Sequence, residues 1–152
     1  MKLDPKQVKA KIKMWQGILK LEPLWNVSFK IRNSAMDMSE GNEDAMACIA
    51  VDLRYFMAEI EFNSPEIEEG DLDCIILHEL LHIILEPIAI SSGCGLGEDY
   101  EEMNSVLTES TIERLMPGYL GLFEKAYGIK TTNNKATTKK SATRSIRCKH
   151  KS

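Results

Sequence analysis

Long apolar runs are missing from this sequence of 152 residues. The longest unbroken one, residues 45–51, contains seven residues, whereas a helix that crosses a bilayer needs about 20. The N-terminal stretch MKLDPKQVKAKIKMW alternates lysine with apolar residues and has neither a continuous apolar segment nor a small-residue cleavage site. We therefore expect a cytoplasmic chain with no membrane partner.

A disulfide framework is missing too. The four cysteines follow no regular spacing; they are Cys48, Cys74, Cys94 and Cys148. Cysteines without such a pattern are typical of proteins in reducing compartments. The sequence thus predicts free thiols, which agrees with a cytoplasmic location.

Acidic residues are missing from the C-terminal segment. Residues 130–152 contain eight Lys or Arg and no Asp or Glu, whereas residues 1–129 contain 11 basic and 23 acidic residues, a net charge of −12. The C-terminal segment is rich in Ser, Thr, Asn and Lys and has almost nothing to bury, which is typical of disordered tails. We predict one domain, residues 1–129, and a basic, disordered tail, residues 130–152. Only this tail is suited to contact nucleic acid.

The N-terminal half predicts a helix followed by three strands. Asp4 and Pro5 form a helix start, and Pro23 is expected to end that helix. Its apolar positions are Val8, Ile12, Trp15 and Leu19. Residues 25–31 alternate apolar and polar side chains, as a half-buried strand does. Residues 33–44 predict a loop, and residues 47–51 and 55–63 a hairpin that turns near residues 52–54.

The C-terminal half predicts helices. One should begin near Asp71 and stop at Pro87, because the residue before a proline avoids helical geometry. The glycine-containing stretch SSGCGLGED is expected to connect it to a helix over residues 99–116. Pro117 and Gly118 should break that helix before a short last one, residues 119–127. The fold class predicted is α+β: an N-terminal helix, a small, mostly antiparallel sheet of about three strands, and two further helices.

The first of these helices contains HELLH, residues 78–82. His78 and His82 are one turn apart on one helix face, so both imidazoles can reach one ion, and Glu79 is next to them. The other residues from Ile75 to Leu85 are all aliphatic, which indicates a helix buried on every side. Burying an unpaired polar group costs about 1–3 kcal/mol, so a shared partner is needed, and a divalent cation would provide it.

A catalytic zinc site has three protein ligands and one open position. The only other histidine is His150, in the predicted tail. Glu109 lies within an apolar stripe of the following helix, a place where a carboxylate needs a partner such as a metal ion. That stripe consists of Met103, Val106, Ile112 and Met116, widened by Leu107 and Leu115. Glu102, seven residues earlier, is the alternative ligand. Glu113 could orient a histidine ring, but for Glu113 and Glu101 a solvated acidic face is the favoured interpretation.

A helix with HExxH followed by a helix with a glutamate resembles the gluzincin, or thermolysin-like, metallopeptidases. The resemblance covers residues 47–116 and extends to small metallopeptidases of phage and bacterial genomes. It implies a zincin-like fold and peptide-bond hydrolysis. Zinc would be bound by His78, His82 and Glu109, with Glu79 as the general base. The strand over residues 55–62 would be the edge strand that holds an extended peptide.

Several roles stay open at this point. Tyr100, Tyr119 and Tyr127 are candidates for stabilising an oxyanion. Glu59 and Glu61 could favour basic substrates, but we expect plain solvation to explain them. The alternative function is a non-catalytic zinc-containing protein that binds a protein partner through its edge strand.

Overall fold

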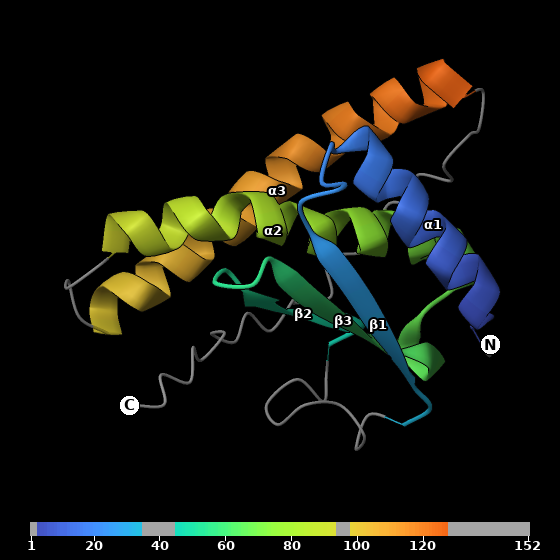
Figure 1. Ribbon diagram of the computed structural model, residues 1–152, viewed down its shortest axis with the longest axis horizontal. Helices are drawn as coiled ribbons and strands as arrows, with labels where there is room; N and C mark the ends of the chain where they lie inside the picture. Colours follow the sequence, from blue (N-terminus) through green and yellow to red (C-terminus); the bar gives the residue numbers. More distant parts are fainter. Residues whose placement is uncertain (1–2, 35–44, 94–97, 128–152) are drawn as a thin grey trace.

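The computed structural model describes residues 3–34, 45–93 and 98–127. Its helices are α1 (Pro5–Ile18), α2 (Leu72–Gly93) and α3 (Glu98–Tyr127), and its strands are β1 (Asn26–Arg32), β2 (Ala47–Asp52) and β3 (Met57–Asn63). The three helices lie on one side of the sheet, with α1 and α2 nearest to it (Figure 1). The predicted α+β class with an N-terminal helix and three strands is confirmed. The predicted tail and most of the predicted loop lie outside the described residues.

Helix α1 begins as its sequence predicts but ends early. The side chain of Asp4 accepts a hydrogen bond from the backbone N–H of Lys6, and Pro5 occupies the first turn. The helix ends at Ile18 rather than near Pro23, because Lys20 adopts a left-handed backbone conformation with φ of 58°. Val8, Ile12 and Trp15 are buried, as their helical spacing predicts.

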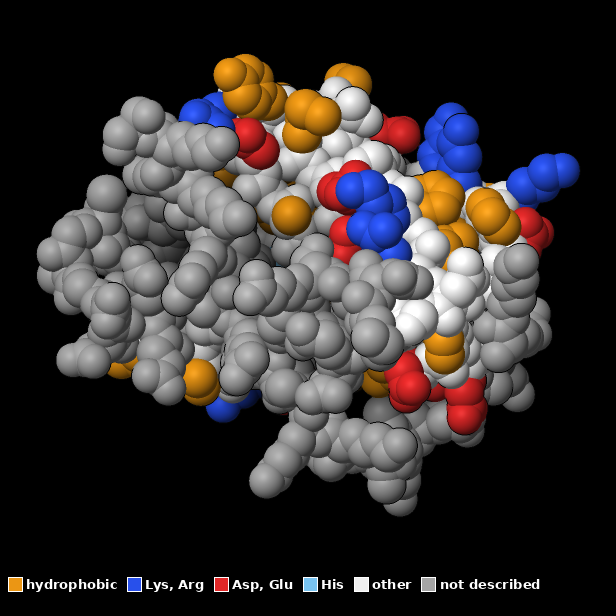
Figure 2. Space-filling view, turned by 90° about the horizontal axis from the view of Figure 1, so that it is seen from below, with side chains coloured by type: hydrophobic (Ala, Val, Ile, Leu, Met, Phe, Trp, Pro, Cys, Tyr) orange, Lys and Arg blue, Asp and Glu red, His pale blue; other side chains and the backbone are white. Residues whose placement is uncertain are grey.

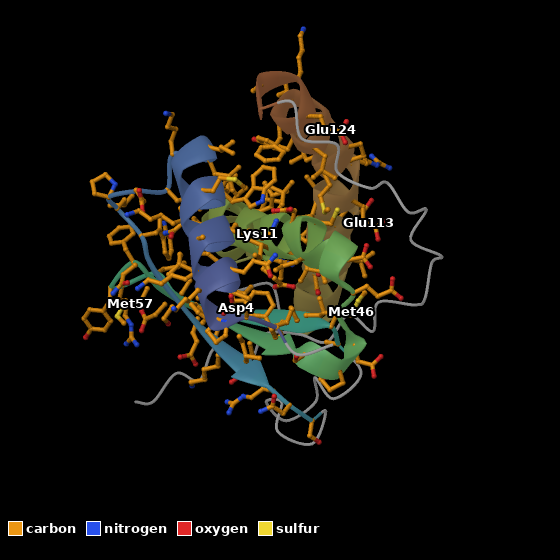
Figure 3. All side chains as sticks on the ribbon, turned by 90° about the vertical axis from the view of Figure 1, so that its right-hand side faces the viewer. Asp4, Lys11, Met46, Met57, Glu113 and Glu124 are labelled. Atoms are coloured by element: carbon orange, nitrogen blue, oxygen red, sulfur yellow. The ribbon has the colours of Figure 1, made fainter. Side chains whose placement is uncertain are left out.

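The sheet has the strand order β1–β3–β2. Strands β2 and β3 form the predicted antiparallel hairpin, with Ile49 opposite Ile60. Strand β1, however, pairs parallel to β3, so the sheet is mixed and not mostly antiparallel. The connection between β1 and β2 is long enough for β2 to lie on the far side of β3. Figure 3 shows Met46 and Met57, which mark the two ends of the hairpin, at opposite ends of the sheet.

This strand order corrects a prediction about β3. The strand expected at the edge of the sheet is the central strand, paired on both sides. Its backbone therefore cannot hold an extended peptide. The outer strands are β1 and β2, and β2 packs beside α2.

The two faces of the sheet differ in polarity. The side chains that face the helices are apolar; they include Phe29, Ile49, Ala58, Ile60 and Phe62. On the opposite face, Lys30 forms an ion pair with Glu59. Arg32 forms one with Glu61, in which 2.7 Å separates a guanidinium nitrogen from a carboxylate oxygen. Acidic and basic side chains lie against each other on the described surface seen from below the sheet (Figure 2). Glu61 is buried, so the expectation that it is freely solvated is wrong.

Both C-terminal helices continue past the prolines that were expected to end them. Helix α2 includes Pro87, and α3 includes Pro117 and Gly118. A proline inside a helix removes one hydrogen bond, but its own φ is compatible with helical geometry. Beyond Pro117, Phe123 is buried with its ring centroid 4.7 Å from that of Trp15. Packing of the segment after the proline thus stabilises one continuous helix.

Candidate metal centre

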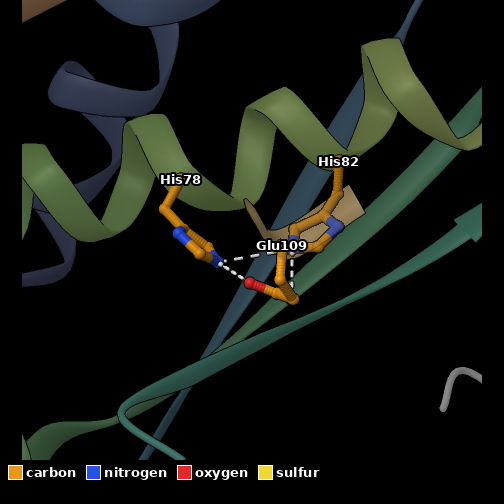
Figure 4. Close-up of side chains that lie close together, drawn as sticks. All are labelled: His78, His82 and Glu109. Carbon is orange, nitrogen blue, oxygen red and sulfur yellow. Dashed lines mark hydrogen bonds and ion pairs between the residues drawn. The ribbon is translucent and has the colours of Figure 1, made fainter. Parts of the chain in front are cut away.

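Two histidines of α2 and one glutamate of α3 converge in the structure (Figure 4). The Nε2 atoms of His78 and His82 are 3.3 Å apart. One carboxylate oxygen of Glu109 lies 3.3 Å from Nε2 of His78, and the other lies 3.2 Å from Nε2 of His82. Each residue directs one possible ligand atom at a common point, so the group could hold a metal ion. These are the three ligands that the sequence predicts.

Helix α2 positions its two histidines because it is buried along the whole motif. The aliphatic residues Ile76, Leu77, Leu80, Leu81 and Ile83 are at most 1% exposed. They contact the sheet, α1 and α3, which fixes the rotation of the helix about its axis. One turn separates the histidines, so a fixed rotation directs both rings toward α3.

Helix α3 positions Glu109 by a narrower buried face than the sequence predicts. Ile112 is fully buried, and Met116 packs against the core. Glu109 lies one and two turns from these residues and therefore shares their face. The other members of the predicted stripe are exposed: Met103, Val106, Leu107 and Leu115. The position of Glu109 was predicted correctly, although most of the stripe used to place it was not.

The remaining candidate residues do not join the cluster. The side chains of Glu102 and Tyr100 are outside the described part, as is His150. Glu113 is exposed, and its link to His78 is a longer-range electrostatic one. The side chain of Tyr127 is not among those described, and Tyr119 makes no described hydrogen bond to the three candidate ligands. The structure therefore does not select an oxyanion donor.

In the metal-free cluster, the charges of Glu109 and the histidines shift each other's pKa values. Burial raises the pKa of Glu109, but hydrogen bonds to His78 and His82 outweigh it and lower that pKa to about 2. Burial lowers the pKa of His78, but the hydrogen bond to Glu109 and the charges of Glu79 and Glu109 raise it overall. An ionised Glu109 and a positively charged His78 therefore stabilise each other. A metal ion would replace the proton on the histidine.

Glu79 is buried beside this cluster. Only 7% of the residue is exposed, and His78, His82 and Glu109 are its electrostatic neighbours. Burial raises its pKa, and the charges of His78 and His82 lower it less. A buried carboxylate with a raised pKa is a suitable group to accept and release a proton.

Cys48 is a neighbour of the site that the sequence did not reveal. Burial raises the pKa of its thiol to about 12, and the negative charges of Glu79 and Glu61 add to this effect. The thiol is thus neutral, and it is free, as is that of Cys74. Only the strand register places Cys48 near α2. Nothing in the sequence spacing links it to HELLH.

Comparisons with known proteins add no relative. No protein-family model, curated protein or solved structure matches the chain. Within the described residues, the helices are too short or too polar to span a membrane.

Proposed function

We propose that the chain is a zinc-dependent peptidase whose metal is bound by His78, His82 and Glu109. The observation that carries this proposal is the convergence of two imidazole nitrogens, 3.3 Å apart, with one carboxylate, whose oxygens each lie 3.2–3.3 Å from one of these nitrogens. Zinc binds His nitrogen at about 2.0–2.1 Å in tetrahedral sites, which separates neighbouring ligand atoms by about 3.3–3.4 Å. The 3.3 Å between the two imidazole nitrogens matches that separation.

The donor set also fits a catalytic rather than a structural zinc. Structural zinc sites are closed by four protein ligands, most of them cysteines, whereas catalytic sites use three and leave one position open. Two imidazoles and one carboxylate are such a set of three. A bound zinc ion supplies Lewis-acid chemistry, because it polarises a carbonyl group and lowers the pKa of water.

Glu79 is proposed as the general base. It follows His78 directly and is buried next to both histidines, so its carboxylate would take a proton from the attacking water. It would then pass this proton to the nitrogen of the leaving amine. A purely structural metal site has no need of a buried carboxylate beside its ligands. Glu79 is therefore the residue that favours a peptidase over a non-catalytic zinc protein.

An extended substrate would pair with β2. Strand β3 is paired on both sides, whereas β2 has one partner among the described residues and packs beside the metal-binding helix. Backbone groups on an open strand edge bind extended peptides without regard to their sequence. The same edge would serve the alternative function, in which the chain binds a protein partner and cleaves nothing.

Metal content tests the ligand set. Inductively coupled plasma mass spectrometry of the purified chain should find about one zinc per wild-type chain. His78→Ala and Glu109→Gln should each lose it, because each removes one of three ligands. Glu113→Gln is the matched control on α3 and should keep it. Zinc retained by Glu109→Gln would contradict the assignment of the third ligand.

Hydrolysis of a mixed peptide library tests the reaction. Glu79→Gln should retain zinc and lose at least about 100-fold in cleavage rate, because the general base is lost. A zinc-loaded wild type that cleaves nothing would favour the alternative, a binding protein. Equal cleavage by wild type and Glu79→Gln would contradict the role given to Glu79.

A further inference from the structure

Helix α3 exposes a row of large apolar side chains on the face opposite to its metal ligand. Met103, Leu107, Leu115 and Leu122 are 51%, 56%, 39% and 66% exposed. They recur with Thr111 and Gly118 at intervals of three or four residues, so the six form one line along the helix, the outer stripe. Glu109 is two residues from both Leu107 and Thr111, which places it about 160° around the helix from each. The outer stripe therefore lies behind the metal centre.

An apolar row of this length is unusual on the surface of a folded domain. Single exposed leucines are common, but contiguous apolar patches mark contact surfaces. The outer stripe covers about 28 Å of helix at 1.5 Å per residue. Because α3 is apolar on two opposite faces, we expect each face to pack against a partner surface.

The rest of the chain offers no suitable cover for the outer stripe. The segment after α3, residues 128–152, contains eight Lys or Arg and only two large aliphatic residues, Ile129 and Ile146. Residues 35–44 contain four acids and, as large apolar residues, only Met36 and Met38. These compositions suit solvent better than a stripe of leucines. The composition of these segments favours an occupant from another chain.

The outer stripe is complementary to itself when two copies run antiparallel. Superposing the midpoints of the two stripes places Met103 opposite Leu122 and Leu107 opposite Gly118 of the second copy. An added Cβ on Gly118 or Gly121 would meet nothing within 4 Å, so these positions are open to an approaching side chain. Leu107 of each copy thus faces the open position of Gly118 in the other, and the contact is the same in both directions, as a two-fold contact requires.

Charge favours the same arrangement. Residues 98–102 at the start of α3 include four acids, whereas Lys125 is near its end and the chain continues into the basic segment from Lys130. An antiparallel pair brings the acidic start of each helix toward the end of the other, where Lys125 lies, and the two helix dipoles then run in opposite directions, which is favourable. A parallel pair would bring acid against acid.

We infer that two copies of this chain associate through the outer stripes of antiparallel α3 helices. The two metal centres then face away from the interface, and both stay accessible. This inference depends on neither the metal nor the peptidase activity, so it can fail while the proposed function holds, and the reverse.

Analytical ultracentrifugation of the full chain over about 1–200 μM, a range that covers micromolar association, tests this inference. The wild type should approach twice the chain mass of 17.2 kDa at high concentration. Leu107→Glu should weaken association at least about tenfold, because it places a charge within the interface. Leu24→Glu is the matched control: Leu24 is 60% exposed but lies in the α1–β1 connection, so association should be unchanged. A wild type that stays monomeric throughout, or equal weakening by both variants, would overturn the inference.

Cysteine cross-linking tests the orientation. In a background with the four native cysteines replaced by serine, Leu107→Cys and Gly118→Cys chains are mixed and oxidised. An antiparallel pair should give the mixed disulfide between the two variants. A parallel pair would give Leu107→Cys linked to itself, and that result would overturn the antiparallel arrangement. Circular dichroism on each variant separates loss of association from loss of fold.

Discussion

Helices α2 and α3 both carry many aliphatic residues, but the fold uses them differently. In α2 the aliphatic side chains surround the helix axis, and those from Leu72 to Ile83 are buried. In α3 the buried side chains form one narrow face that includes Ile112 and Phe123, while the outer stripe faces solvent. A polar residue in α2 therefore needs a partner within the protein, whereas a polar residue in α3 usually finds water.

Because α2 is buried and α3 is largely exposed, a polar residue in α2 is stronger evidence of a functional role than one in α3. His78, Glu79 and His82 are the only polar side chains in their segment, and burial leaves them few roles besides metal binding and proton transfer. Glutamates of α3 such as Glu113 are exposed and need no special role. Glu109 is informative only because it shares the narrow buried face. The position in space, more than the residue type, makes it a candidate ligand.

The largest expected effect on stability is that of truncating a buried leucine of α2, and an exposed leucine of α3 is its comparison. Leu80→Ala in α2 should reduce the free energy of unfolding by about 2–5 kcal/mol, because it removes a fully buried side chain and leaves a cavity. Leu107→Ala on the outer stripe should change it by no more than about 0.5 kcal/mol when the chain is monomeric. Urea denaturation at low protein concentration measures both. A similar loss in the two variants would show that the outer stripe is part of the monomer core.

The sequence predicted the features that depend on local pattern. The cap at Asp4, the β2–β3 hairpin and the buried HELLH helix follow from side-chain chemistry, alternation and an apolar run, and all three are confirmed. Glu109 was predicted because it shares a helix face with Ile112 and Met116. The motif alone predicted two of the three candidate ligands, and the third was predicted from one face of the following helix.

The features that were predicted wrongly depend on contacts between distant segments. The parallel pairing of β1 with β3 follows from the path of the chain between β1 and β2, which no local pattern encodes. The continuity of α3 across Pro117 is stabilised by Phe123 against Trp15, a contact between the two ends of the domain. The outer stripe and the buried face of α3 have the same helical spacing, so periodicity alone could not choose between them.

The pH dependence of stability should differ between variants of Glu109 and variants of its exposed neighbour Glu113. The pKa of Glu109 is lowered from 4.5 to about 2, so its stabilising effect is present above pH 4.5 and lost as the pH falls toward 2. The pKa of His78 is raised above 6.5, so its effect is present below pH 6.5 and lost as the pH rises through the raised value. The metal-free chain should be most stable between these limits.

Thermal unfolding in the presence of a chelator, from pH 3 to about 9, measures this window. Glu109→Gln should remove part of the loss of stability at acid pH, because the variant has no carboxylate to protonate there. Glu113→Gln should leave that loss unchanged, since Glu113 is exposed. An identical acid response in all three proteins would contradict the pairing of Glu109 with the histidines.

The smallest expected effect concerns the start of α2, where α1 fixes the helix by polar contacts. Asp73 pairs with Lys11 and accepts a hydrogen bond of 3.1 Å from the indole N–H of Trp15. Asp73→Asn keeps an acceptor for Trp15 but removes the charge, so unfolding should become easier by about 1 kcal/mol. Glu59→Gln removes the more exposed pair with Lys30 and should cost less, about 0–1 kcal/mol. Because Trp15 also packs against Phe123 of α3, a larger loss in Asp73→Asn would indicate that the position of α3 depends on this contact as well.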